Sequence, residues 1–191
     1  MAYAAVDYSS LLGMPGFSDG LLKNHFTLYR GYVANTNKLL ERISAAAPAE
    51  GAPSPEFSEL KRRLGWEFNG MRLHELYFEN LGGGGSPEKA AGLGKAIAAD
   101  FGSLEAWQKE FKAIGMMRGI GWVVLYKDPR SGRLINFWVN EHDVSHPAGC
   151  TPVVVMDVFE HAYMPDYGLK RADYIEAFFK NLNWEAANSR A

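Results

Sequence analysis

Three ionisable side chains follow an apolar run in the last third of the chain. The run occupies residues 152–156, and Asp157, Glu160 and His161 come directly after it. Its valines favour a buried strand, so the three groups stand where a strand gives way to a turn. A lone carboxylate or imidazolium is costly to bury, and such groups usually come paired or bound to a metal. This segment is the strongest sign of a chemical function in the chain.

Two of the five histidines stand at apolar positions of predicted helices. His25 and His74 each lie in a long stretch with leucines and aromatic residues at helical spacing. One such histidine is more often a hydrogen-bonded core residue than a ligand. Two of them on neighbouring helices, with Asp157 and His161 at a strand end, favour a metal site. Three imidazoles and one carboxylate suit iron or manganese, whereas structural zinc sites favour cysteine, of which the chain has one, Cys150.

Apolar spacing predicts two long helices that position these histidines. The first covers residue 18 to about 46 and the second covers residue 55 to about 80. Residues 45–53, broken by two prolines, form the linker between them. Ser54 before a proline is typical of a helix start, and the four glycines at 82–85 end the second helix because glycine disfavours helix. The pair predicts a helical hairpin.

The rest of the chain predicts shorter helices and a small sheet. The expected elements are helices that begin at Ser86 and Ser103, strands at 121–126, 134–139 and 152–156, and a helical tail at 173–190. This order predicts an α+β fold, with an N-terminal long helical hairpin followed by a C-terminal lobe of a three-stranded antiparallel sheet and surrounding helices. We divide the chain into a helical hairpin domain at 1–83 and an α/β domain at 84–191, each with two of the candidate ligands.

Composition excludes several other classes of protein. The formal charge of −2 comes from 20 basic and 22 acidic residues that are well interspersed, which argues against a nucleic-acid binder. The chain has no apolar run of the roughly 20 residues that a membrane helix needs, and its first residues do not resemble a signal peptide. One cysteine among 191 residues suits a reducing compartment. We therefore expect a soluble cytoplasmic protein.

Four dispersed segments resemble the iron/manganese superoxide dismutase family, in the family's order. Residues 157–163 resemble its Asp-x-Trp-Glu-His-Ala-Tyr signature, with Phe159 where tryptophan is usual. The continuation through 166–190 follows its C-terminal pattern. Residues 119–122 resemble its Gly-Ser-Gly-Trp strand start, and residues 74–78 resemble its His-x-x-Tyr/Phe-Trp helix segment. Chance is not a serious competitor, and the resemblance spans nearly the whole chain.

The resemblance implies a mononuclear metal enzyme. It implies that His25, His74, Asp157 and His161 ligate one ion per subunit, iron or manganese, because the same ligands serve both metals. The expected reaction converts superoxide to dioxygen and hydrogen peroxide by alternating reduction and oxidation of the metal. A redox-inactive structural relative that retains the fold is the alternative, and the four intact ligands count against it. A non-haem iron oxygenase is a third class, but such sites favour two histidines and one carboxylate.

Two further residues are implied as catalytic. Tyr32 resembles the family's gateway tyrosine, although it follows His25 by seven residues where the family usually has eight. Tyr29, four residues after His25 and on the same face, is a rival for that role. His142 resembles the second-sphere histidine of a subset of the family, many of them iron enzymes; a loop histidine without a role, beside His146, is the alternative. Together with Gly70, which stands where other members carry glutamine, His142 favours iron over manganese.

The remaining implied residues concern substrate and partner subunits. Lys23, Arg30 and Arg171 are candidates for a funnel that attracts an anionic substrate, of which Arg171 best resembles the family's funnel arginine. An ordinary surface charge is the alternative for each. Glu160 resembles the residue that bridges to the ligand histidine of a partner subunit, and Tyr163 is expected at the same interface. The resemblance therefore implies a homo-oligomer, a dimer or a tetramer.

Overall fold

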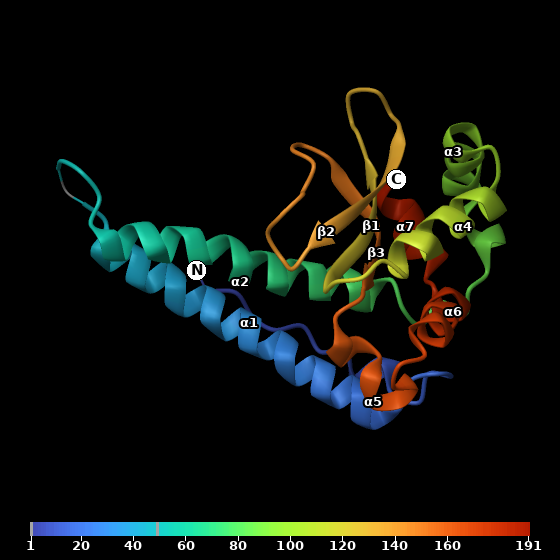
Figure 1. Ribbon diagram of the computed structural model, residues 1–191, viewed down its shortest axis with the longest axis horizontal. Coiled ribbons are helices and arrows are strands. Elements are labelled where there is room, and N and C mark those ends of the chain that lie inside the picture. The colour runs from blue at the N-terminus through green and yellow to red at the C-terminus, as the bar shows by residue number, and fades with distance from the viewer. Residues whose placement is uncertain (1, 49) are drawn as a thin grey trace.

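Two long helices lie side by side in the N-terminal part of the chain and extend away from the rest of the molecule (Figure 1). The computed structural model describes residues 2–48 and 50–191, so position 49 of the predicted linker lies outside the described residues. The helices are α1 (Asp19–Ala46) and α2 (Pro55–Glu79), and the side chain of Ser54 caps α2 by accepting from the amide of Phe57. The predicted hairpin is confirmed.

A three-stranded antiparallel sheet forms the centre of the C-terminal lobe. Its strands are β1 (Gly121–Lys127), β2 (Leu134–Asn140) and β3 (Thr151–Asp157), with β1 in the middle. Trp122 on β1 pairs with Asp157 on β3, which is the last residue of its strand. The predicted α+β class, with its hairpin and three-stranded sheet, is confirmed, and β3 delivers the candidate carboxylate at its end.

Short helices surround the sheet. They are α3 (Ala91–Phe101), α4 (Leu104–Gly115), α5 (Met164–Tyr167), α6 (Arg171–Asn181) and α7 (Trp184–Arg190). Figure 1 shows α3 and α4 on one side of the sheet and α6 below it. Within the described residues, no helix is long and apolar enough to span a membrane. The division of the chain at residues 83 and 84 stays a prediction, and the buried apolar residues of both parts form one continuous cluster.

The C-terminal tail differs from the single helical run that periodicity predicts. It is two helices, α6 and α7, separated at Leu182 and Asn183. The glycine run packs against this break: a Cβ on Gly83 would lie 2.3 Å from the Cα of Asn183. The amide of Asn183 donates to the carbonyl of Asn80 at 2.8 Å. A contact with a distant segment, which local periodicity does not encode, therefore breaks the helix.

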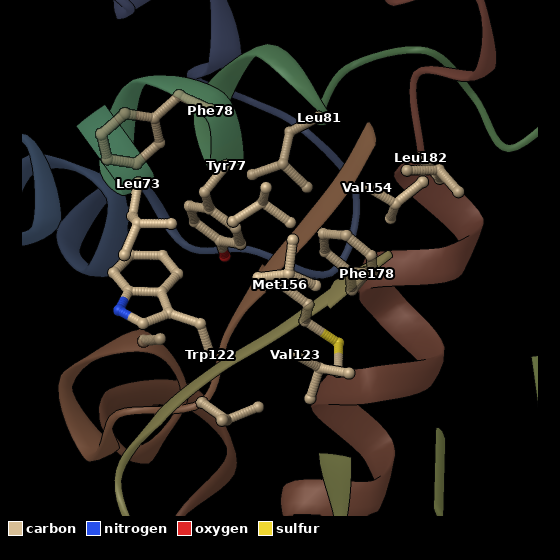
Figure 2. Packing of buried hydrophobic residues seen from close by; sticks show 14 of the residues in the cluster. Leu73, Tyr77, Phe78, Leu81, Trp122, Val123, Val154, Met156, Phe178 and Leu182 are labelled. Atoms are coloured by element: carbon tan, nitrogen blue, oxygen red, sulfur yellow. The ribbon is translucent and has the colours of Figure 1, made fainter. Parts of the chain in front are cut away.

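The core lies where the C-terminal half of α2 meets the sheet and α6. Figure 2 shows Tyr77 of α2 between Trp122 of β1 and Phe178 of α6, and all three side chains are fully buried. The rings of Tyr77 and Phe178 stack at 6.0 Å. Burying large aromatic side chains contributes about 2–3 kcal/mol each. This packing fixes α2 against the strand that ends at Asp157.

Candidate metal centre

Three candidate ligands from three separate elements converge on one oxygen atom of the fourth, Asp157. Oδ2 of Asp157 lies 3.1 Å from Nε2 of His25 on α1, 3.7 Å from Nε2 of His74 on α2, and 3.2 Å from Nε2 of His161 in the short turn after β3. All four ligand atoms lie within 4.8 Å of one another. The structure therefore brings the four predicted residues together, although the sequence separates His25 from Asp157 by 132 positions.

Local contacts leave one oxygen of Asp157 free for the histidines. Its Oδ1 accepts a hydrogen bond of 2.8 Å from the amide of Phe159, two residues on, as in an Asx turn. Its backbone carbonyl accepts a bond of 2.6 Å from the buried hydroxyl of Tyr174. The carboxylate is thereby held in one orientation, with Oδ2 directed at the imidazoles.

The tautomer of His74 is set by its own helix. Its Nδ1 lies 2.5 Å from the carbonyl oxygen of Gly70, and a carbonyl only accepts, so Nδ1 carries the hydrogen. Burial, with the nearby His25, holds the pKa of His74 well below its ordinary value, so the ring is neutral. Nε2 then presents a lone pair to the cluster. It is buried without a hydrogen-bond partner among the described residues, and such an atom requires an explanation.

The cluster has the electrostatics of a metal site. Burial raises the pKa of Asp157, but the charges and hydrogen bonds of His161 and His25 outweigh burial and hold that pKa well below its ordinary value. Burial lowers the pKa of His25. Burial also acts to lower the pKa of His161, but Asp157 outweighs it and raises that pKa. Imidazole binds a metal only when neutral, so the raised pKa of His161 makes protonation of this ring compete with metal binding.

The donor set fits iron or manganese. Ligand atoms that each lie about 2 Å from one ion are within about 4 Å of each other, as the three distances from Asp157 are. Three nitrogen donors and one carboxylate oxygen match the ligands that these metals accept. A cation at the centre would also supply the missing partner of His74 Nε2.

His142 lies beside this cluster with both ring nitrogens engaged. Nε1 of Trp122 donates to its Nδ1 at 3.1 Å, and its Nε2 lies 2.8 Å from the hydroxyl of Tyr32. Burial lowers the pKa of His142 to about 4, so the ring is neutral at pH 7. Since Nδ1 accepts from an indole that only donates, Nε2 carries the hydrogen and donates to Tyr32. The Tyr32 hydroxyl keeps its own proton, because burial raises its pKa to about 12.

The two candidate gateway tyrosines point to different partners. Tyr32 reaches His142, and it has room to do so because residue 70 is glycine: a Cβ there would lie 2.6 Å from the Tyr32 ring. The hydroxyl of Tyr29 instead donates to a carboxylate oxygen of Glu75 at 2.9 Å. Only Tyr32 therefore directs its hydroxyl to the second-sphere histidine.

Comparison with known proteins agrees with this site. The family model described as "Iron/manganese superoxide dismutases, C-terminal domain" matches residues 89–190. "Superoxide dismutase [Fe]" of Cupriavidus metallidurans is 42% identical over 93% of this chain and 89% of that protein. The chain belongs to the iron/manganese superoxide dismutase family. Other relatives include "Superoxide dismutase [Fe]" of Aquifex pyrophilus, 38% identical over 96% of this chain and 88% of that protein. "Superoxide dismutase [Mn] 2" of Haloferax volcanii is 35% identical over 92% of this chain and 87% of that protein.

The three funnel candidates of this family member bond to groups outside the metal cluster. Lys23 pairs with Asp19 at 3.8 Å, and Arg30 donates to Thr27, both on α1. The guanidinium of Arg171 donates to two backbone carbonyls in the segment between α4 and β1. These contacts do not join the three residues to the metal cluster, and their role in attracting substrate stays a prediction.

Sequence reasoning missed a cation that does lie beside the second sphere. The guanidinium of Arg63 lies 5.0 Å from the ring centroid of Trp66, and the ring centroids of Trp66 and His142 lie 4.9 Å apart with the rings nearly perpendicular. Arg63 also bonds the buried carboxylate of Glu67. Residues 63, 67, 70 and 74 follow one another at spacings of three or four, so they share one face of α2. That spacing back from His74 was the signal that could have found Arg63.

We expect His142 to make the protein acid-sensitive. Its pKa is about 4 in the folded protein and about 6.5 when unfolded, so only the unfolded chain gains this proton as the pH falls from about 6.5 to 4. The resulting loss between pH 7 and pH 5 is about 2 kcal/mol of unfolding free energy. Urea unfolding of the metal-free protein at both pH values should show this loss, and His142→Gln should show a loss smaller by that amount. Equal losses in the two proteins would show that His142 does not have a lowered pKa in the folded protein.

Proposed function

We propose that this chain is a superoxide dismutase that holds one iron or manganese ion at His25, His74, Asp157 and His161. The observation that carries the proposal is the convergence of three imidazoles on one buried carboxylate oxygen in a chain of this family. The reaction takes two superoxide anions and two protons to dioxygen and hydrogen peroxide. A redox-inactive relative is not favoured, because all four ligand groups are present and close together.

The residues around the ion have separable tasks. The bound ion would supply the redox chemistry, accepting an electron from one superoxide and returning it to another. Asp157 contributes one negative charge, and the neutral imidazoles contribute none, which keeps the net charge of the site modest. Buried aromatic residues exclude water: Trp122 packs edge-on against His74, and Phe159 stacks on His142 at 4.7 Å.

Tyr32 and His142 are the proposed catalytic residues for protons. Formation of peroxide needs two protons at a site whose walls are largely apolar. Because His142 donates its Nε2 hydrogen to Tyr32, the hydroxyl proton of Tyr32 is free to point away from His142. We therefore assign the proton-donating role at the site to Tyr32, with His142 as the group that orients its hydroxyl.

Iron is the preferred metal in this proposal, with manganese as the alternative. The support is the pairing of His142 with Gly70: the histidine occupies the second sphere, and the glycine leaves the space that Tyr32 fills. The relatives include proteins named for either metal. Arg171, Lys23 and Arg30 remain the proposed funnel residues, and Arg63 is added to them by its position beside Trp66.

We further propose that two copies associate around the turn after β3. Glu160 is exposed there and Tyr163 is buried, while the His161 side chain is 27% exposed although those of the other three candidate ligands are fully buried. Met164 and Leu169, which follow this turn in the chain, are exposed, as are Met117 and Ile120 in the segment that Arg171 bonds. Exposed apolar residues mark association sites when they gather. A homodimer, or a tetramer built from it, would cover them. A cytoplasmic location and the two-domain division at residues 83 and 84 belong to the same proposal.

Metal content and activity together test the function. The protein reconstituted with iron or manganese should hold about one ion per chain and consume superoxide, and Asp157→Ala should hold none and be inactive, because the only anionic ligand is lost. Elemental analysis and a superoxide-consumption assay measure both. Asp128→Ala, in the exposed turn between β1 and β2, is the matched control and should behave as wild type. A fully loaded wild-type protein without activity would refute the proposal.

Substitution by phenylalanine distinguishes the roles of Tyr32 and Tyr29. Tyr32→Phe should retain metal and lower kcat about tenfold, the worth of one hydrogen bond of about 1.4 kcal/mol. Tyr29→Phe should leave kcat unchanged and lower the unfolding free energy by about 1 kcal/mol, because its hydroxyl bonds Glu75. Steady-state kinetics and urea unfolding measure these effects. The reverse pattern would make Tyr29 the gateway residue.

The oligomeric state tests the proposed interface. The wild-type protein should sediment as a dimer or tetramer, and Glu160→Ala should shift it toward the monomer at micromolar concentration. Glu185→Ala, exposed on α7, removes a carboxylate elsewhere and should leave the assembly intact. A wild-type monomer by sedimentation velocity would show that the interface does not form.

A further inference from the structure

The loop after β2 contains His142 and has two residues with an uncommon backbone conformation. Glu141 has a φ of 51° and Ser145 a φ of 76°, in the left-handed region that residues other than glycine rarely occupy. Asn140, just before Glu141, and Val144, just before Ser145, pair through their backbones. Backbone of this kind persists only where surrounding contacts hold it, so the position of His142 depends on what fixes the loop.

The side chain of His146 makes such contacts on both sides of its ring. Its Nε2 lies 2.8 Å from the carbonyl oxygen of His142, and its Nδ1 lies 2.9 Å from the hydroxyl of Tyr126. A carbonyl only accepts, so Nε2 carries a hydrogen and donates it. Tyr126 is 4% exposed, and burial raises its pKa above the ordinary value. Its hydroxyl therefore keeps its proton and donates to Nδ1.

Strand β1 thereby holds His142 at two points. Trp122 and Tyr126 are four residues apart on β1, so their side chains lie on the same face of the strand. Trp122 donates directly to the imidazole ring of His142. Tyr126 reaches the backbone of the same residue through His146. One rigid strand therefore sets both the ring and the main chain of His142.

We propose that His146 is a positioning residue, which places the ring of His142 against Tyr32 by anchoring the strained loop to β1. The inference rests on the proposed function, in which Tyr32 delivers a proton and His142 orients its hydroxyl. His146 also lines a surface cleft of about 450 Å³. Shortening its side chain therefore opens space that water can enter and leaves no dry void in the core.

Four variants of the iron-loaded protein test this role. His146→Ala removes both hydrogen bonds and should lower kcat about tenfold at unchanged metal content, which corresponds to the loss of one positioned hydrogen bond. His146→Gln keeps an amide that can donate to the carbonyl of His142, and it should retain at least half of the wild-type kcat. Val144→Ala, a 53% exposed side chain of the same loop, is the control and should be unchanged. Tyr126→Phe combined with His146→Ala should match His146→Ala alone, because Tyr126 acts through His146.

Crystal structures of the same variants give a second readout. In His146→Ala the His142 ring should move beyond hydrogen-bond distance of Trp122 Nε1, and in His146→Gln it should stay. Wild-type kcat or an unmoved ring in His146→Ala would overturn the proposal, as would a double variant that loses more kcat than His146→Ala alone. If His146→Ala does not fold, His146→Asn replaces it, since its shorter amide does not reach the carbonyl. An inactive, fully loaded wild-type protein would contradict the proposed function instead, and the position of the His142 ring would still decide the role of His146.

Discussion

A carboxylate that is fully buried at the end of a strand has to be compensated, and that requirement organises this protein. Asp157 has no access to water, and the cost of burying its charge is recovered only if positive or hydrogen-bonding groups surround it. Those groups come from α1, from α2 and from the turn after β3. The hairpin and the sheet must therefore pack against each other for the charge to be tolerated. The aromatic core around Tyr77 and Trp122 supplies the packing that keeps them together.

A second constraint lies in the chain of hydrogen bonds that runs from β1 to the edge of the site. Trp122 donates to His142, and His142 donates to Tyr32, so each donor leaves the next group with one available hydrogen. The direction of this chain depends on the low pKa of the buried His142 ring. It also depends on the absence of a side chain at Gly70, where Tyr32 occupies the space. An apolar wall, a neutral imidazole and a glycine thus act together to orient one hydroxyl group.

Much of the fold could be predicted because it is encoded locally. Apolar residues at helical spacing marked α1 and α2, and Ser54 before a proline marked where α2 begins. Asp157 and His161 were found because the motif that contains them is contiguous. The break between α6 and α7 was missed, because it arises where the glycine run approaches Asn183. Arg63 was missed for a similar reason: it lies near His142 only through the ring of Trp66, which packs between them.

The sequence by itself determined the types of the elements and the identities of the four candidate ligands, because periodicity and short motifs are properties of neighbouring residues. It left Tyr29 and Tyr32 as rivals, since both follow His25 on the same helix. Only the tertiary structure decided which group each tyrosine hydroxyl meets, which tautomer His142 has and what His146 contacts. Each of these depends on a donor or acceptor from another element. The direction of a hydrogen bond is settled by the atom that meets it across the fold, and spacing along the chain carries no record of that atom.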